Sequence, residues 1–390
     1  MKLAILNSLF LFLSFAFAEL QPRKPKINHP EFDKALSTRI LIGLPEYIYF
    51  ADKVDEFPFS FGKNVSGTPS WMAIKPPNLL YVVDESSKYL KLYEIDFDNS
   101  TASLKSEQEG SSGVVHLQFD KNYTRLVGSA YGEGTVDVWN TTNAGLELMK
   151  TIPSQVEPGS KKDSQNKAHP HQANLDPTGR FFVINDLGLD SIMVIDSKDD
   201  KFKVVGTQTA PRGCGPRHGT FYPQQGDKAT HYIVVCESSN KVLVYTVTYG
   251  KDYLDLDQAR STSTFGPGLP PANATTAAAG AIVLASNNRD LYISNRLTGN
   301  STDFISHFHI SSPKSTSLSL EFISCASTHG ISPRTISLST DDRYLLIANQ
   351  GVGDNGLVAL DRQANGILSS VPFAVQGGRN LNPQFVQQIP

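Results

Sequence analysis

Residues 169–186 read HPHQANLDPTGRFFVIND, and this stretch decides the fold. It holds two histidines, an alternating segment, a Pro-Thr-Gly turn and an apolar run that ends in Asn185 and Asp186. Such a pattern is typical of a β-hairpin, whose open strand ends lie at the same sheet edge when the strands are antiparallel. We therefore expect His169 and His171 to stand beside Asn185 and Asp186.

Variants of this hairpin recur along the chain. Further copies begin near residues 69, 113, 216, 279 and 333, and each joins a first strand to an apolar second strand through a turn. The starts lie about 44 to 64 residues apart, the range for four-stranded propeller blades with loops of variable length. Three short strands at residues 39–43, 46–50 and 57–61 precede the first complete unit, and a lone strand at residues 383–389 follows the last.

The repeat predicts an all-β fold, a seven-bladed β-propeller of four-stranded antiparallel blades. The complete units supply six blades, and the N-terminal strands would pair with the C-terminal strand to close the seventh, which removes free sheet edges. The alternative, two stacked all-β domains, has no break in composition to support it. No amphipathic helix of useful length competes with the strands.

Composition restricts the class of partner. The 390 residues include 29 glycines and 23 prolines, which suits a fold with many turns, and the formal charge is only −3. No polybasic block is present, so we expect no nucleic-acid partner. A closed propeller has no need to assemble, and we take a monomer as the default.

The first residues have the pattern of a secretory signal. Lys2 precedes an apolar run at residues 3–17, and Ala16-Phe17-Ala18 fits a small-residue cleavage site. An uncleaved anchor is the alternative, but the run is short and interrupted by polar residues, and we expect no membrane span. The predicted organisation is a signal peptide at residues 1–18, an extended arm at 19–38 and one propeller domain at 39–390. The protein would then be secreted, either extracellular or associated with the cell wall.

Two further features bear on secretion. Asn-x-Ser/Thr sites, candidates for N-glycosylation, occur at Asn64, Asn99, Asn122, Asn140, Asn273 and Asn300. Three cysteines (Cys214, Cys236 and Cys325) allow at most one disulfide within the chain. For each cysteine, the interpretation as a small buried apolar side chain is favoured.

In a propeller, the loop into the first strand and the loop out of the second open on one face of each blade. Polar residues at these positions would surround one central funnel. At the start of first strands these residues are His169, His171, Arg217, His218 and Arg334. At the end of second strands they are Asp84, Asp186, Glu237, Asn295, Arg296, Asn349 and Gln350. Arginine forks bind carboxylate or phosphate groups, and a nearby His or Glu can move a proton. This set predicts acid–base chemistry on a small anionic substrate with no bound cofactor.

Other interpretations stay open for these residues. A polar residue at a strand end often only caps a loop. His169 and His171 have alternate spacing and could together bind a metal, but no acidic or cysteine partner with firm spacing accompanies them, and we assign no metal. His116 and His231 lie elsewhere in their hairpins, which favours structural roles. The chain lacks a serine-nucleophile elbow, a phosphate-cradling glycine loop before a helix and a Cys-x-x-Cys pair.

Five segments together resemble a known family: HPHQANLDPTGRFFVINDLGLDSIMVID, GPRHGTFYP, YIVVCESSNKVLVY, LYISNR and SPRTISLSTDDRYLLIANQ. They are similar to the seven-bladed propeller lactonases, which include the bacterial type of 6-phosphogluconolactonase and the fungal carboxy-cis,cis-muconate cyclases. The resemblance covers most of the chain from about residue 39 onward. The early units depart from it, since residues 113–116 lack a Pro-His or Pro-Arg pair and the first unit uses Pro69-Ser-Trp.

The resemblance implies a catalytic set of one histidine, two arginines and one glutamate, which falls on His171, Arg217, Glu237 and Arg296. We expect the neighbouring polar positions to bind substrate, namely His169, Asp186, His218, Asn295, Arg334 and Gln350. Together with the predicted signal peptide, the resemblance leads us to expect a secreted lactonase that opens or forms the ring of a small anionic lactone or carboxylate. A muconate cyclase-like isomerase and a non-catalytic secreted glycoprotein that binds through the propeller are the two alternatives.

Overall fold

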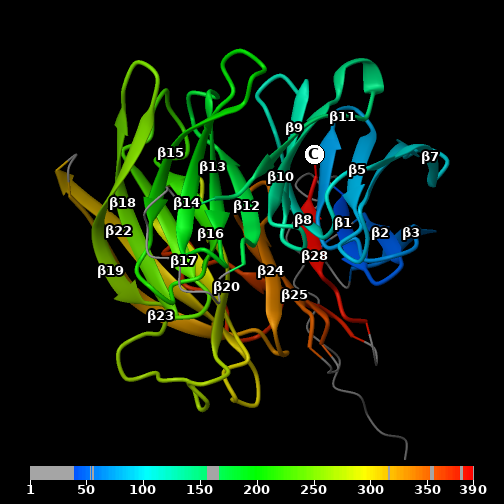
Figure 1. Cartoon of the computed structure of the whole chain (residues 1–390). Coiled ribbons are helices and arrows are strands. Elements are labelled where there is room, and N and C mark those ends of the chain that lie inside the picture. The colour runs from blue at the N-terminus through cyan, green and yellow to red at the C-terminus, as the bar shows by residue number, and fades with distance from the viewer. Residues whose placement is uncertain are drawn as a thin grey trace, which may run out of the picture.

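The computed structural model describes residues 39–52, 54, 57–155, 167–314, 317–351, 355–377 and 381–389. Its strands form seven four-stranded antiparallel sheets, which are the blades of a propeller and are called here blades A to G (Figure 1). The predicted all-β, seven-bladed architecture is therefore confirmed. The signal peptide and the extended arm predicted at residues 1–38 lie outside the described residues.

The first three blades contain the N-terminal third of the chain and one C-terminal strand. Blade A consists, in order across the sheet, of β28 (Phe385–Gln388), β1 (Ile40–Leu44), β2 (Tyr47–Ala51) and β3 (Phe59–Asn64). Blade B consists of β4 (Met72–Lys75), β5 (Leu79–Val83), β6 (Tyr89–Asp96) and β7 (Thr101–Glu109). Blade C consists of β8 (Val114–Phe119), β9 (Arg125–Ala130), β10 (Thr135–Asn140) and β11 (Glu147–Pro153).

The other four blades follow in chain order. Blade D has β12 (Pro170–Leu175), β13 (Phe181–Asp186), β14 (Ser191–Asp196) and β15 (Lys203–Thr209). Blade E has β16 (Pro216–Tyr222), β17 (His231–Cys236), β18 (Lys241–Tyr249) and β19 (Leu254–Ser263). Blade F has β20 (Ala278–Leu284), β21 (Asp290–Arg296), β22 (Phe304–Lys314) and β23 (Ser317–Ser327). Blade G has β24 (Pro333–Leu338), β25 (Tyr344–Asn349), β26 (Leu357–Asp361) and β27 (Ala374–Gln376).

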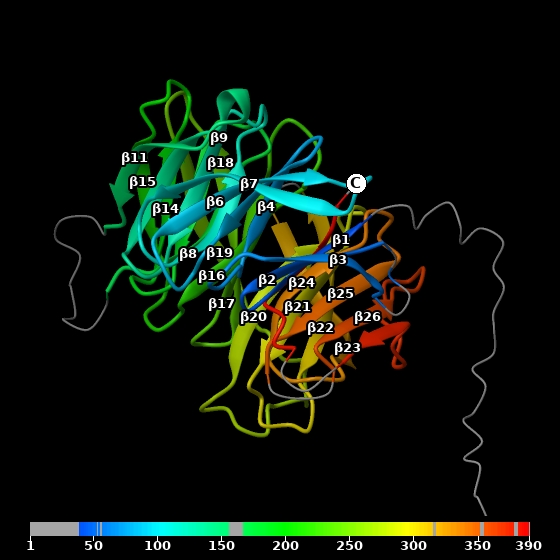
Figure 2. The same ribbon diagram turned by 90° about the vertical axis from the view of Figure 1, so that its right-hand side faces the viewer.

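Blade A closes the ring in the predicted way. Strand β28 pairs antiparallel with β1, so that Ile40 faces Gln388 and Ile42 faces Val386. Figures 1 and 2 show the red C-terminal segment running among the blue N-terminal strands. A blade built from both ends of the chain leaves no unpaired inner edge at the junction.

The innermost strands form the wall of a central channel. Strands β4, β8, β12, β16, β20, β24 and β28 contact one another in sequence around the axis, and Figure 1 shows most of their labels near the middle of the molecule. Strands such as β13, β17 and β25 are buried along their whole length. This double-sided burial explains why the second strand of each hairpin reads as a continuous apolar run.

The hydrophobic core is divided among the blade interfaces. Each of seven buried clusters contains side chains from two neighbouring blades, as where Phe181 and Val183 of blade D pack with Tyr232 and Val234 of blade E. Full burial of one such aliphatic or aromatic side chain contributes about 1.5–3 kcal/mol. Blade packing therefore fixes the inner strands, and with them the side chains at their ends.

The hairpin at residues 169–186 forms as predicted, with β12 antiparallel to β13. Its turn is held by Asp176, whose carboxylate accepts the backbone N–H groups of Thr178, Arg180 and Phe181 at 3.0, 3.0 and 2.7 Å. Gly179 has a φ of +80°, a conformation that glycine adopts without strain. The turn thus depends on a side-chain acceptor and a glycine at fixed positions.

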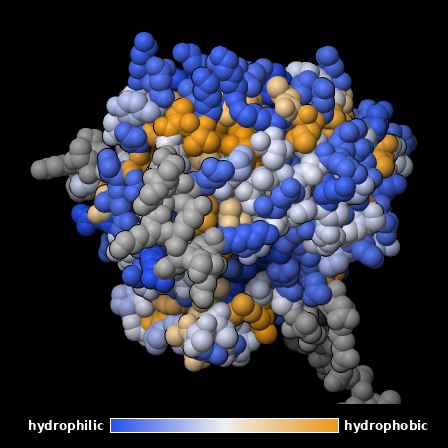
Figure 3. All heavy atoms as spheres, viewed as in Figure 1, coloured by the Kyte–Doolittle hydropathy of each residue, from blue (hydrophilic) through white to orange (hydrophobic). Residues whose placement is uncertain are grey.

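Helix is nearly absent from the part of the chain that the structure describes. Its helical element is one 3₁₀ turn, Thr142–Ala144. Within the same ranges, no helix is long and apolar enough to cross a bilayer. The face in Figure 3 is mostly hydrophilic, with smaller hydrophobic patches between the polar side chains.

Candidate active site

The site is built on irregularities at the start of the inner strands. The pairing register shifts between Pro170 and Gln172 in blade D, between Pro216 and Gly219 in blade E, and between Pro333 and Thr335 in blade G. Such a β-bulge takes residues out of the ladder and redirects their side chains. The residues inside these three bulges are His171, Arg217, His218 and Arg334. All four were predicted to belong to the site.

Three of the four predicted catalytic residues are in direct contact. Arg217 Nε and Arg296 Nη2 each lie 2.7 Å from Oε2 of Glu237. Arg217 also donates a 2.9 Å hydrogen bond from Nη1 to the carbonyl of Gly280. The Arg217 side chain is 3 % exposed, whereas that of Glu237 is 27 % exposed. Two fixed guanidinium groups therefore surround one carboxylate that solvent or a ligand can reach.

The fourth residue, His171, lies in a group of buried aromatic rings. Its ring centroid is 5.0 Å from that of His218, and His218 is 6.0 Å from His116. The ring of Trp71 lies tilted against that of His116, with 4.1 Å between the ring centroids. His116, for which a structural role was favoured, packs in this group, and its Nδ1 accepts a 3.4 Å hydrogen bond from the backbone N–H of Ala173. His231 lies away from this group, with Nδ1 2.9 Å from the hydroxyl of Thr230.

Burial, together with nearby positive charges, keeps His171 and His116 neutral. Burial, followed by the positive fields of Arg217, Arg334 and Arg296, lowers the pKa of His171 well below 6.5. Burial and the charge of Arg217 lower the pKa of His116 to about 3. A neutral imidazole can accept a proton. Among the described residues, no hydrogen-bond partner is found for the buried Nδ1 of His171.

Arg217 remains charged at neutral pH. Burial and the nearby Arg296 lower the pKa of Arg217 to about 9, against the opposing effect of Glu237. Arg217 therefore carries its charge at pH 7, where its planar fork can bind an anionic oxygen.

A second ion pair lies at the same face of the propeller. Nη2 of Arg334 lies 2.5 Å from Oε2 of Glu85. Glu85 was not predicted, although it directly follows Asp84, which the sequence places at the end of a second strand. The carboxylate of Asp84 instead accepts the backbone N–H groups of Thr68 and Ser86 and holds the loop.

Four predicted substrate-binding residues lie around the funnel with other contacts. His169 stacks on Tyr131, at 4.3 Å between ring centroids. Asp186 is fully buried and accepts the backbone N–H groups of His169 and Leu189 at 2.9 Å. Asn295 is also buried and donates to the hydroxyl of Ser306 at 3.0 Å.

The fourth, Gln350, follows β25 at the blade position that Glu237 occupies after β17. Its backbone N–H donates to Ser332 as that of Glu237 donates to Gly215. These contacts give His169 and Asp186 roles in holding the rim, while Gln350 keeps a half-buried side chain.

The channel continues beyond the histidines. Trp71 and His116 also line a cavity of about 470 Å³ with Gln118, Phe119 and Gln387. These last residues belong to the far halves of the inner strands, so the cavity lies on the opposite side of the aromatic group from the arginines. The rings of Trp71, His116 and His218 thus separate the funnel from the cavity.

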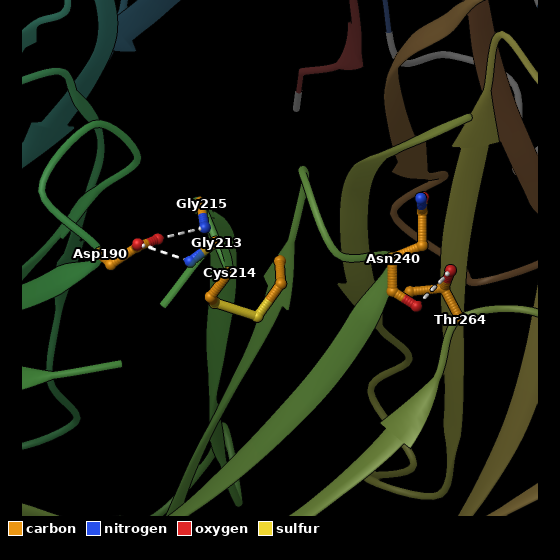
Figure 4. The surroundings of a disulfide bond; sticks show 7 residues. Asp190, Gly213, Cys214, Gly215, Asn240 and Thr264 are labelled. Atoms are coloured by element: carbon orange, nitrogen blue, oxygen red, sulfur yellow. Dashed lines mark hydrogen bonds between the residues drawn. A yellow bond between two sulfur atoms is a disulfide. The ribbon is translucent and has the colours of Figure 1, made fainter. Parts of the chain in front are cut away.

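A disulfide holds the segment that carries Arg217 and Glu237. Cys214 and Cys236 are both buried, as expected, and they are joined to each other, which is the one disulfide that the sequence left open. Cys325 is free and exposed, which departs from the buried side chain that was favoured. Figure 4 shows Asp190 accepting the N–H groups of Gly213 and Gly215, on both sides of Cys214, at 2.7 Å.

One cluster outside the funnel has metal-ligand chemistry. Nε2 of His307 and of His309 lie 3.0 and 3.1 Å from Oδ1 of Asp290. However, Arg362 binds the other carboxylate oxygen, and Nε of Arg289 lies 3.5 Å from Oδ1. Two guanidinium groups already balance the charge of the single carboxylate, and we assign the cluster a structural role between blades F and G.

The architecture agrees with a comparison against known families. The model of the family described as "Lactonase, 7-bladed beta-propeller" matches residues 61–381, which is most of the chain. The chain belongs to this family. The lactonase description of the family supports the prediction that the protein is an enzyme.

Named relatives and solved structures extend the comparison. A protein of Arthroderma benhamiae named "Probable 6-phosphogluconolactonase" is 32% identical over 256 residues, which cover 64% of this chain and 63% of the relative. The 6-phosphogluconolactonase of Bacillus subtilis is 24% identical over 331 residues, which cover 83% of this chain and 88% of the relative. The structure of a periplasmic gluconolactonase of Pseudomonas aeruginosa aligns with a TM-score of 0.73 at 19% identity, over 90% of this chain and 99% of that one. This last likeness is one of fold.

Proposed function

We propose that the protein is a lactonase that opens the ring of a small anionic sugar lactone, of the 6-phosphogluconolactone type. The observation that carries this proposal is the contact of Arg217 and Arg296 with one oxygen of Glu237, in the funnel that also holds neutral His171. The relatives named 6-phosphogluconolactonases support this substrate class. The two alternatives, cycloisomerisation of muconates and binding without catalysis, have no comparable support.

The geometry can serve each step of lactone hydrolysis. The lactone carbonyl oxygen would lie against the guanidinium groups of Arg217 and Arg296, which polarise the carbonyl and stabilise the negative charge that develops on this oxygen. His171 or Glu237 would take a proton from the attacking water. The water oxygen bonds to the carbonyl carbon, the ring C–O bond breaks, and the leaving ring oxygen takes the proton. The products are a free hydroxyl and a carboxylic acid.

Glu237 can promote release of the product by competing for the two arginines. The acid ionises at neutral pH and binds the arginines more tightly than the neutral lactone carbonyl does, because the charge is now complete. Glu237 is the group that competes with this carboxylate for the guanidinium pair. Its partial exposure allows it to return to the arginines as product leaves.

A hydrolysis assay on a panel of lactones tests the proposal. Turnover of 6-phosphogluconolactone above the uncatalysed rate is expected, and Arg217→Ala should lower kcat about 10²–10³-fold, the loss typical of one oxyanion donor. Arg125→Ala is the matched control, because Arg125 pairs with Asp200 on the opposite face. Equal activity of the Arg217→Ala and Arg125→Ala proteins would exclude this mechanism. Proton exchange on muconates without lactone hydrolysis would favour the isomerase alternative.

We further propose that the protein is a secreted glycoprotein, at the cell wall or outside the cell. Five of the six glycosylation candidates are exposed (Asn64, Asn99, Asn122, Asn273 and Asn300), while Asn140 is half-buried and accepts a hydrogen bond from Arg125. A buried disulfide also fits an oxidising compartment. Expression in a secreting host should give medium-borne protein whose mass falls on treatment with an N-glycosidase. Retention of unglycosylated protein inside the cell would contradict secretion.

A further inference from the structure

The funnel carries one Glu–Arg arrangement twice. Glu85 of blade B and Glu237 of blade E occupy the same place, since the backbone N–H of each donates to the loop before the inner strand (to Thr68 at 3.0 Å and to Gly215 at 2.8 Å). Each carboxylate binds an arginine that directly follows a proline at the start of an inner strand. These arginines are Arg334 for Glu85 and Arg217 for Glu237.

The two arrangements differ in how firmly the arginine is fixed. Arg217 is buried and also donates to the Gly280 carbonyl, and Arg296 lies 3.4 Å from the Ala279 carbonyl, so both belong to a preorganised site. Arg334 is 15% exposed and Glu85 is 29% exposed. Arg296 and Glu237 have similar exposures of 12% and 27%, so the two arrangements differ chiefly in the burial and the backbone hydrogen bond of Arg217. An incoming anion that displaces Glu85 keeps Arg334 paired with a negative charge, while Glu85 can turn toward solvent.

Arg334 is placed to bind a substituent of the substrate that lies away from the reacting carbonyl. Arg334 comes from blade G and Glu85 from blade B, so their ion pair spans blade A, whereas Arg217 and Arg296 come from blades E and F. Arg334 nevertheless contributes, with Arg217 and Arg296, to the lowered pKa of His171. The three guanidinium groups therefore act on one enclosed space.

Blade A and blade B add polar atoms beside this ion pair. Gln384 follows Pro383 at the start of the inner strand of blade A, and Thr335, the neighbour of Arg334, donates to its backbone carbonyl at 2.6 Å. Ser70 follows Pro69 in blade B. Both side chains are more than nine-tenths buried, and within the described part of the chain neither Oε1 of Gln384 nor Oγ of Ser70 has a hydrogen-bond partner. Buried polar atoms without partners are costly unless a ligand or water meets them.

The charges leave room for one anion. The ion-paired groups of the funnel are three arginines and two glutamates, and His171 is neutral, so these groups together carry one net positive charge before substrate binds.

We propose that Arg334 determines substrate specificity by binding the anionic substituent of the lactone, a phosphate or carboxylate group, and that this group displaces Glu85. Arg217 and Arg296 then act on the ring carbonyl. This division of labour rests on the lactonase function proposed above. It assigns Glu85 the role of an internal competitor that occupies Arg334 when no anionic substrate is bound.

Paired substrates test the proposal. Steady-state kcat/KM is measured for 6-phosphogluconolactone and for uncharged gluconolactone with the wild-type protein and the Arg334→Gln variant. The ratio of kcat/KM for 6-phosphogluconolactone to kcat/KM for gluconolactone should fall at least about tenfold in the variant, the loss typical of a charge-assisted contact. The kcat/KM for the uncharged lactone should change less than about threefold. Arg334→Lys keeps the charge without the fork and should give an intermediate ratio.

Two further variants sharpen the test. Glu85→Gln removes the competitor, so KM for the phosphorylated lactone should fall while KM for the uncharged lactone stays the same. Arg125→Gln, on the opposite face, is the control and should leave the ratio unchanged. Thermal unfolding of each variant shows whether its fold is intact. An equal loss for both substrates in a folded Arg334→Gln protein, or an unchanged ratio, would overturn the proposal.

Binding of inorganic phosphate separates this proposal from the lactonase function. If the wild-type protein hydrolyses neither lactone, the proposed function fails. Calorimetry then still decides the role of Arg334, because phosphate binding that is lost in Arg334→Gln supports an anion site. Phosphate binding that is equal in both proteins, or absent from both, rejects it.

Discussion

Arg217 Nε and Glu237 Oε2 lie 2.7 Å apart, although Arg217 lies at the start of the first strand of blade E and Glu237 follows the second. The antiparallel hairpin brings these two strand ends together, and the bulge between Pro216 and Gly219 turns the arginine toward the glutamate. Arg296 reaches the same oxygen from blade F. Assembly of blades E and F is therefore required to build the pair of arginines.

Replacement of Glu237 by glutamine tests whether this carboxylate moves a proton. If it is the general base, Glu237→Gln should lower kcat about 10²–10⁴-fold, while the amide still bonds to the arginines. If His171 is the base, the loss in kcat should instead appear in His171→Gln, and Glu237→Gln should mainly slow product release. Rapid-quench kinetics distinguish the two results. No effect of either variant on kcat would contradict both assignments.

The pH profile should reflect the buried, neutral state of His171. Because burial and three arginines lower the pKa of His171, kcat/KM should stay constant as pH falls to 6.5 and decline only below it. Removal of one positive charge in Arg334→Gln favours the protonated imidazole, so the acid limb should move to higher pH. The profiles are measured with the uncharged lactone, so that substrate charge does not vary. An acid limb that is identical in both proteins would remove His171 from the mechanism.

Folding stability should also depend on the buried histidines. The pKa of His116 is lowered from 6.5 to about 3 in the folded protein. Between these two pH values the histidine is therefore protonated in the unfolded chain and neutral in the folded protein. The contribution is complete above pH 6.5 and is lost as pH falls toward 3, by about 1.4 kcal/mol per pH unit for each such histidine. Denaturant unfolding between pH 5 and 6.5 should therefore show a smaller slope in His116→Gln than in the wild type. Equal slopes would show that His116 is protonated in the folded protein.

The disulfide should stabilise both the fold and the site. Cys214 and Cys236 are 22 residues apart, and closure of a loop of this size contributes about 3 kcal/mol in the chain-entropy model. The double variant Cys214→Ser/Cys236→Ser should lose about this free energy of unfolding in urea. It should also lose activity, because Cys236 directly precedes Glu237. The single variant Cys325→Ser is the control and should retain both properties. Full activity and stability of the double variant would show that the hydrogen bonds of Asp190 suffice to hold the loop.

The fold could be predicted because the pattern of hydrophobic residues repeats with each blade. Second strands buried between two blades read as apolar runs, and the lone strand at residues 383–389 matched the three unpaired N-terminal strands. The meeting of Arg217, Glu237 and Arg296 could also be predicted, since it depends only on which strand ends share a face.

The remaining features depend on local register, which the sequence does not reveal. Glu85 lies one residue beyond Asp84, and only the backbone contact to Thr68 shows that it matches Glu237. His116 reaches the channel because the register shifts between Val114 and His116. Likewise, the pairing of Cys214 with Cys236 depends on the path of a loop. The sequence offered only a weak signal, because Glu85 is the second residue after β5 whereas Glu237 directly follows β17.

The construction of blade A has a consequence for biosynthesis. Its inner strand, β28, lies beyond all the other blades in the sequence, yet it pairs with β1, which the ribosome makes first. The ring cannot close until translation has passed residue 388 and this segment has left the exit tunnel. Until then, the apolar surfaces of blades A and G that later pack together lack strand β28. These surfaces stay exposed in the nascent chain and can bind chaperones. The substrate funnel should therefore be complete only once β28 has paired with β1, in the compartment where the chain completes its folding.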